Sequence, residues 1–238
     1  VLFGLAFTLA TFTSVNWYPS FWGTLERMGG LWSFWHYIIF LVIITSVLRT
    51  REEWYHFLYL SIFTSLLSSL YGFGQKTNIS FFIGSGGRER IFGTIGNPAL
   101  FAGYEIINFF LALALYARAQ LTPSKKVLLI SALILDGLAI IMTVVRGSVL
   151  GLGVGLFVFA VLYYMVYRSS IARKSILGLV AFAAICFVIL ITPIKDIGFI
   201  SNSSFLSRFT DTSFDAFTAK TRFWAWQAGF NGWNDTVK

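Results

Sequence analysis

Long runs of apolar residues, separated by shorter polar connections, form the main pattern of this chain. A helix that crosses a membrane needs about 20 mainly apolar residues. Seven stretches approach or reach that length, the first only in part: residues 1–15, 31–48, 54–73, 98–117, 127–145, 147–167 and 176–194. The pattern predicts an all-α fold: a polytopic integral membrane helix bundle with about seven spans over residues 1–194.

The polar connections predict an orientation for this bundle. Three connections are short and rich in Lys and Arg: 49–53, 118–126 and 168–175. The alternate segments are longer and contain fewer Lys and Arg per residue: 16–30, 74–97 and the tail from 195. Because Lys and Arg concentrate in cytoplasmic loops, we expect the short basic connections inside the cell and the alternate segments outside.

The two ends of the chain favour a fragment of a larger protein. Residues 1–15 have neither a basic n-region nor a small-residue cleavage site, so we interpret them as the last part of a membrane helix. Residues 195–238 are more polar and carry interspersed aromatic side chains: Phe214, Phe217, Phe223, Trp224 and Phe230. This tail predicts amphipathic helices on the membrane surface at the start of a large extracytoplasmic loop.

Composition excludes several other classes of protein. Of the 238 residues, 57% are hydrophobic and 12% are charged, with a mean hydropathy of +0.75, whereas roughly 25% charged residues are typical of soluble domains. The net charge of +8 is assigned to membrane topology, so we expect membrane lipids and no nucleic acid as partners. Cys186 is the single cysteine, and no metal-ligand spacing occurs, so no metal or cofactor is expected.

Arginines on the predicted outer side are the main candidates for chemistry: Arg27, Arg88, Arg90, Arg146, Arg208 and Arg222. A guanidinium presents a fixed fork of donors that matches phosphate oxygens. Arg146 separates two apolar runs without a loop, and a cation at that depth is costly unless it is paired or lines a wet cavity. The alternatives are a side chain that snorkels to the interface and, for Arg88 and Arg90, an ordinary solvated loop arginine.

The segment 88–104 combines these charges with an irregular backbone. The Asn97-Pro98 pair predicts the start of a helix with Asn97 as its cap, and a helix N-terminus favours an anion. Gly93 and Gly96 permit a tight backbone that turns amides toward such an anion.

Two carboxyl groups lie within predicted spans. Glu105 is about 10 Å below the outer surface by helical rise, where it either pairs with Arg146 or remains a buried carboxylate. Asp136 either accepts interhelical hydrogen bonds, which we favour, or acts in a proton relay.

Gly147, Gly151 and Gly155 share one helix face and predict small-residue packing. For Trp17 and Trp22, an interfacial aromatic belt and sugar stacking both stay open.

Four stretches, in order along the chain, resemble the bacterial O-antigen ligase and polymerase family. GTIGNPALFAGY (93–104) looks like the family's signature, and SFWGTLERMGGL (20–31) is similar to its upstream Trp-Gly…Glu-Arg…Gly-Gly loop. TVVRGSVLGLGVG (143–155) looks like its Ser-Arg-Gly segment, and TAKTRFWAWQAG (218–229) like the Arg-x-x-Trp segment of its large outer loop. This chain has Val145 in place of the usual Ser and Ala99 where Asn often follows Asn-Pro, and residues 195–238 lack the histidine that ligases use as base.

The resemblance implies a metal-independent glycosyltransferase of the C type in the bacterial inner membrane. Such an enzyme transfers a glycan from an undecaprenyl-diphosphate carrier to lipid A core, a growing polysaccharide or a protein. The matched motifs imply catalytic roles for Arg146 and Arg222. The candidate substrate-binding residues are Arg27, Arg88, Arg90, Asn97 and Glu105. Two other classes stay open: a transporter or flippase coupled through Glu105 and Asp136, and a non-catalytic membrane scaffold.

Overall fold

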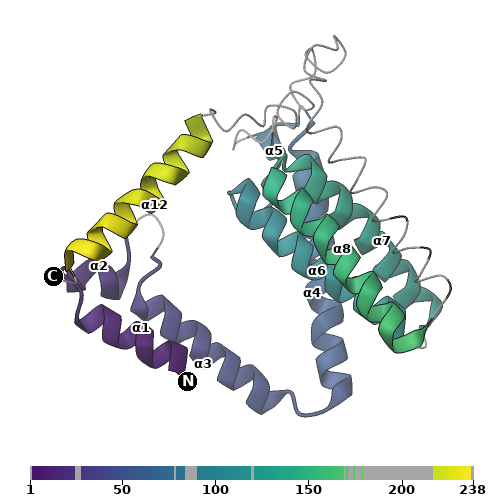
Figure 1. Ribbon diagram of the computed structural model, residues 1–238. Helices are drawn as coiled ribbons and strands as arrows, with labels where there is room; N and C mark the ends of the chain where they lie inside the picture. Colours follow the sequence, from purple (N-terminus) through teal and green to yellow (C-terminus); the bar gives the residue numbers. More distant parts are fainter. Residues whose placement is uncertain are drawn as a thin grey trace, which may run out of the picture. The chain divides into compact units, whose positions relative to one another are not determined.

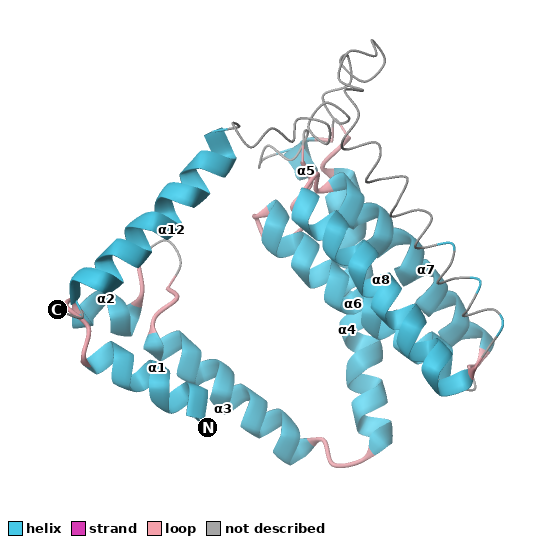
Figure 2. Cartoon of the chain, in the orientation of Figure 1, coloured by secondary structure: helices cyan, strands magenta, loops and turns pink. Residues whose placement is uncertain are grey.

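The computed structural model describes residues 2–24, 28–77, 79–83, 90–118, 121–168 and 217–236, together with residues 170, 174 and 178. Within these ranges the regular structure is helical throughout and contains no strand (Figures 1 and 2). The chain forms two compact units, residues 1–60 and 61–238, and each is described by itself.

Nine helices are described. Their bounds are α1 (Leu2–Phe12), α2 (Trp17–Trp22), α3 (Leu31–Val47), α4 (Arg51–Gly74), α5 (Ser80–Ile83), α6 (Pro98–Arg118), α7 (Pro123–Met142), α8 (Arg146–Tyr167) and α12 (Phe217–Thr236). α2 and α5 are short helices inside segments that the sequence predicted as connections. The predicted span 176–194 lies outside the described residues apart from Gly178.

Three described helices, α4, α6 and α8, are long and apolar enough to cross a membrane. The described elements confirm the all-helical class. The predicted set of about seven spans is not confirmed. α1 and α3 are apolar but have 11 and 17 residues, fewer than the about 20 of a full span. α7 has 20 residues and carries two lysines in its first turn and Asp136 in its second half.

In the first unit, α1 packs against α3 through aromatic rings. The Phe34 ring lies 5.5 Å from the ring of Phe3 and 4.8 Å from that of Phe7. The indole N–H of Trp35 donates to Thr8 Oγ1 at 3.2 Å. Apolar packing and a hydrogen bond therefore both fix the pair of helices.

The two tryptophans of the first predicted outer loop differ in their surroundings. The ring of Trp22 lies 5.7 Å from that of Trp32 at the start of α3, and Trp17 is 61% exposed. This arrangement is compatible with an interfacial belt and with sugar stacking.

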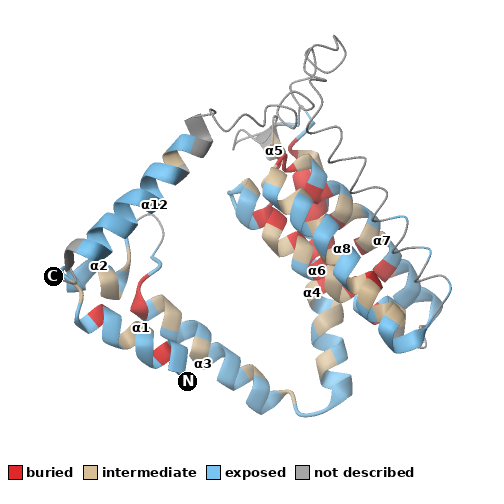
Figure 3. Cartoon of the chain, viewed as in Figure 1, coloured by how far each residue is buried: buried red, intermediate tan, exposed pale blue. Residues whose placement is uncertain are grey.

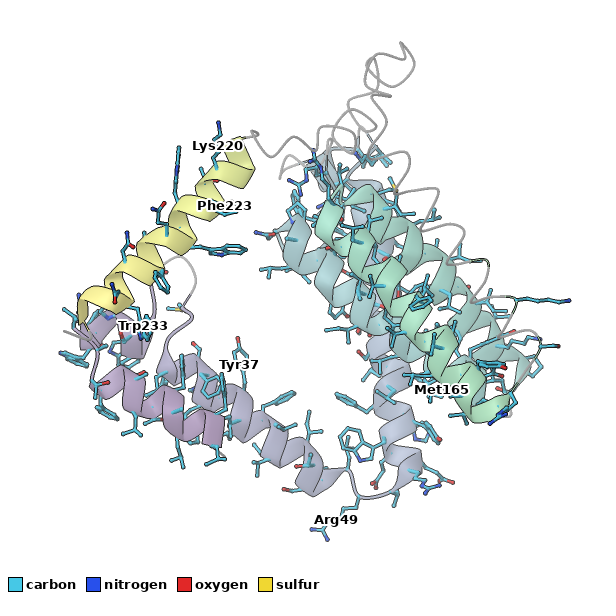
Figure 4. The ribbon with its side chains drawn as sticks, viewed as in Figure 1. Tyr37, Arg49, Met165, Lys220, Phe223 and Trp233 are labelled. Carbon is cyan, nitrogen blue, oxygen red and sulfur yellow. The ribbon has the colours of Figure 1, made fainter. Side chains whose placement is uncertain are left out.

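α4 begins with a capping box. Glu53 Oε2 accepts hydrogen bonds from the backbone N–H groups of Arg49 and Thr50, at 2.8 and 2.9 Å, and Thr50 Oγ1 accepts from the N–H of Glu53 at 3.2 Å. Such reciprocal bonds satisfy N–H groups that a helix start leaves without partners. The short basic connection before α4, where Figure 4 labels Arg49, is therefore a defined turn.

The second unit is built around the packed pair α6 and α7, with the C-terminal half of α4 and with α8 beside it. Its buried residues gather where α4, α6 and α7 face one another (Figure 3). Ile91, Phe101 and Ala139 are fully buried and pack with Phe73 and Met142. A residue from the loop before α6 thus enters the same core as residues of three helices.

α8 packs more loosely than this core, since Ala160 is its one buried residue among those described. A Cβ added to Gly155 would overlap the ring of Phe110 of α6, whereas Gly147 and Gly151 have nothing within 4 Å in the described structure. The predicted small-residue packing is therefore observed at Gly155, whereas the described residues place no neighbour against Gly147 or Gly151.

α12 confirms a helix in the tail. Four of its aromatic residues, Phe223, Trp226, Phe230 and Trp233, follow the spacing of one helix face and are 63–72% exposed, and Figure 4 labels the first and the last of them. Trp224 is also exposed and lies on the other side of the helix, so α12 does not show the amphipathic character that the sequence predicted.

Two glycines in the loop before α6 give a matched test of what fixes that loop. Both have positive φ, +54° at Gly93 and +81° at Gly96, but an added Cβ overlaps the buried Phe101 ring at Gly93 and meets nothing within 4 Å of described structure at Gly96. We expect Gly96→Ala to lower the free energy of unfolding by about 1–2 kcal/mol through backbone strain. Gly93→Ala should cost about 1–3 kcal/mol more through overpacking, and thermal unfolding in detergent measures both. Equal losses would show that Phe101 does not confine the loop.

Candidate functional site

The loop before α6 is held in place by the side chain of Gln75, just after the end of α4. Gln75 is fully buried. Its Oε1 accepts from the backbone N–H groups of Phe92 and Gly93, at 3.0 and 3.2 Å, and its Nε2 donates to the carbonyl of Gly93 at 3.1 Å. One amide side chain thus satisfies three backbone groups and fixes the path of the loop.

The start of the same loop is bonded to the turn between α7 and α8. Arg90 Nε donates to the carbonyl oxygen of Thr143 at 3.0 Å. The backbone N–H of Ile91 donates to the carbonyl oxygen of Met142 at 3.4 Å. Thr143 lies three residues before Arg146. The fold therefore brings Arg90 and Arg146, two of the arginines predicted from the sequence, to the same end of the second unit.

The turn that positions Arg146 is short, as the sequence predicted. α7 ends at Met142 and α8 begins at Arg146, and Val144 between them has φ of +55°. Arg146 is half-buried at the first position of α8 and Arg90 is half-buried in its loop. The bond from Arg90 to Thr143 uses one of the five donors of its guanidinium.

The starts of α6 and α8 differ in how their amides are satisfied. Asn97 Oδ1 accepts from the N–H groups of Ala99 and Leu100, at 2.8 and 3.4 Å, which confirms Asn97 as the cap of α6. Val145, which precedes α8, makes no side-chain cap. Since Asn97 already occupies amides of α6, the N-terminus of α8 is the better place for an anion.

This arrangement corrects one sequence-based expectation. Gly93 and Gly96 were expected to turn loop amides toward an anion, and both do have positive φ. However, Gln75 already binds the amides of Phe92 and Gly93. The amide of Gly93 is therefore used within the loop, and Gly93 itself lies against the ring of Phe101.

A second polar cluster lies in the core, between α4 and α7. Asp136 is fully buried. Its Oδ1 accepts from the hydroxyl of Ser69 at 3.2 Å, and its Oδ2 lies 2.9 Å from that of Ser65. Asp136 therefore makes the interhelical hydrogen bonds that we favoured from the sequence.

Glu105 of α6 lies beside this cluster and is buried without a hydrogen bond to its carboxyl group in the described structure. It is 0% exposed, and neither of its carboxyl oxygens has a hydrogen-bond partner in the described structure. The charged group that it faces is the carboxyl of Asp136. The expected alternative of pairing with Arg146 is not observed.

The cluster belongs to a polar stripe along α4 that sequence reasoning missed. Ser61 donates to Asn108 Oδ1 at 2.8 Å, Thr64 lies 3.2 Å from the phenol oxygen of Tyr104, and Ser68 lies 2.9 Å from Thr94 Oγ1. The sequence does carry a signal for this stripe. The polar residues recur at helical spacing in an otherwise apolar segment: Ser61, Thr64, Ser65, Ser68, Ser69 and Gln75.

The other predicted site residues are placed only in part. Arg27, Arg88 and Arg208 lie outside the described residues. Arg222 lies in the first half of α12, and its side chain is outside the described part of the structure. Within the described ranges, no group of three His, Cys, Asp or Glu side chains is placed to hold a metal ion.

Comparisons of the chain with protein-family models, with curated proteins and with solved structures gave no match.

Proposed function

We propose that this protein transfers a glycan from an undecaprenyl-diphosphate carrier to an acceptor at the outer face of the bacterial inner membrane. The acceptor class is a lipid A core, a growing polysaccharide or a protein. The observation that carries the proposal is the hydrogen bond from Arg90 to the carbonyl of Thr143. It joins the signature-like loop to the turn that presents Arg146, so two separate motifs contribute cations to one end of the helices.

The diphosphate of the donor would bind at the start of α8. There the partial positive charge of a helix N-terminus without a side-chain cap adds to the charges of Arg90 and Arg146. Arginine suits this task because its planar fork pairs with two phosphate oxygens at once. Arg27, Arg88 and Arg222 are assigned to the same polar surface on the resemblance.

The reaction would be a displacement at the anomeric carbon of the glycan. An acceptor hydroxyl attacks that carbon from the face opposite the carrier, the bond from carbon to phosphate oxygen breaks, and undecaprenyl diphosphate leaves with the electron pair. Positive charge fixed beside the leaving oxygens stabilises the transition state more than the ground state. The proton of the attacking hydroxyl passes to a base that the described residues do not assign.

The orientation in the membrane follows from the same proposal. Arg90, Arg146 and the start of α8 would face the extracytoplasmic side, and the capping box at the start of α4 would lie at the cytoplasmic side. The charges support this, because the connection at residues 49–53 and the end of α8 at Arg168 are both basic.

Reconstitution separates this proposal from its main rival, a transporter or flippase. The full chain is placed in liposomes with a lipid-linked oligosaccharide and a soluble glycan acceptor, and both the extended glycan and the released undecaprenyl diphosphate are measured. We expect equal amounts of the two products. Movement of the lipid-linked donor across the bilayer without a new glycosidic bond would instead establish a flippase.

A further inference from the structure

Glu105 is a buried acid that the proposed glycan transfer does not use. A carboxylate that is 0% exposed and whose oxygens make no hydrogen bond with the described residues carries a large penalty, because burial removes its water. The nearby hydroxyl of Ser69 donates to Asp136 instead. The neighbouring charge is a second carboxyl, that of Asp136, which repels rather than compensates a negative charge.

Two facing carboxylates in a dry core are unfavourable together, so the pair is expected to hold a proton. A proton on Glu105 would turn the repulsion into a hydrogen bond from Glu105 to Asp136. That bond supplies the partner that Glu105 lacks. Asp136 suits the role of the ionised member, because hydroxyls of α4 lie at both of its oxygens.

The hydroxyl of Ser65 fits either protonation state of Asp136. Its Oγ lies 2.9 Å from the carbonyl of Ile62 and 2.9 Å from Asp136 Oδ2, although one hydroxyl has a single hydrogen to donate. When Asp136 is ionised, Ser65 donates to it. When Asp136 carries a proton on Oδ2, it donates to Ser65, which then donates to Ile62. No heavy atom has to move between the two states.

We propose that Glu105 and Asp136 form a proton-binding site in the core of the helices, where the two carboxyl groups share one exchangeable proton. Besides the approach of two acids, Glu105 itself points to a bound proton, because it is fully buried and its oxygens make no hydrogen bond with the described residues. The proposal does not depend on glycan transfer, since neither residue is bonded to Arg90 or to the start of α8 by any contact described above.

The groups around the pair favour a proton over another cation. Tyr104, whose phenol oxygen lies 3.2 Å from Thr64 Oγ1, is a further titratable group near the pair among the described residues. The basic residues of the packed helices lie toward helix ends: Arg51 and His56 on α4, Arg118 on α6, Lys125 and Lys126 on α7, Arg146 at the start of α8 and Arg168 just after its end. The described structure holds no third acid, histidine or cysteine with which the pair could hold a metal ion.

Infrared spectroscopy of the full chain in lipid tests this directly, since a protonated carboxyl has a carbonyl stretch that a carboxylate lacks. We expect such a band in the wild-type protein, shifted in D₂O and shifted by ¹³C-carboxyl labelling of Glu or Asp. Glu105→Gln should abolish the band, because Asp136 then faces a neutral amide. Glu52→Gln, which changes an exposed carboxyl of α4, should leave it unchanged.

Three results would overturn the proposal: no protonated band in the wild-type protein, a band that survives Glu105→Gln, or a band that disappears when sodium chloride replaces choline chloride. The last would identify a sodium site instead. If Glu105→Gln does not fold, the isotope labelling of the wild-type protein decides, because a band that shifts with neither label contradicts the proposal.

Discussion

Replacing Arg146 with glutamine is expected to reduce glycan transfer by about 10²- to 10³-fold, the range measured when one preorganised donor to a developing negative charge is removed. Arg146 stands at the first position of α8, where its charge adds to that of a helix N-terminus without a side-chain cap. Glutamine keeps much of the length of the side chain and removes the charge. The loss should appear in the rate of formation of the extended glycan by the reconstituted protein.

Arg168→Gln is the matched control for this experiment. Arg168 follows the other end of the same helix and is exposed. If Arg146→Gln lowers transfer because it removes a charge from the diphosphate site, Arg168→Gln should leave the transfer rate unchanged. Both variants should be present in the membrane in equal amounts. Equal activity of the Arg146 variant and the wild type would remove Arg146 from the mechanism.

Replacing Gln75 with leucine is expected to lower the free energy of unfolding by about 3–5 kcal/mol. The change leaves the N–H groups of Phe92 and Gly93 and the carbonyl of Gly93 without their partner, and each buried backbone group without a hydrogen bond costs about 1–3 kcal/mol, less where water can enter. Thermal or denaturant unfolding in detergent measures the loss.

Gln227→Leu makes the same chemical change at an exposed position of α12 and should be nearly neutral. Transfer should also fall in the Gln75 variant, since Arg90 lies two residues before Phe92 in the released loop. A Gln75→Leu variant as stable as the wild type would mean that the loop satisfies its backbone groups without this side chain.

Hydrophobic pattern and local capping signals were sufficient for part of the fold. The start of α6 followed from Asn97-Pro98, and the short turn before Arg146 followed from two apolar runs without a loop. The number of spans did not follow, because an apolar run does not fix where a helix ends. α1 and α3 are shorter than a full span, and α7 combines two lysines with Asp136.

The candidate site was predictable in its residue types and less so in its contacts. Arg90 and Arg146 were selected for their charge and predicted position, but nothing local indicates that Arg90 bonds to the carbonyl of Thr143, a residue 53 positions away. The role of Gln75 was missed because the residue lies just beyond an apolar run and was counted with a connection. Its helical spacing from Ser61, Ser65 and Ser68 was the signal that marks the inward side of α4.

The capping box at the start of α4 bears on how the chain enters the bilayer during synthesis. All of its bonds lie within Arg49–Glu53, so they can form while later residues are still inside the ribosome. Starting a helix is the costly step of its formation, and here that step needs no partner helix. The position at which α4 starts is therefore fixed by its own local sequence, before α6 and α7 have been synthesised.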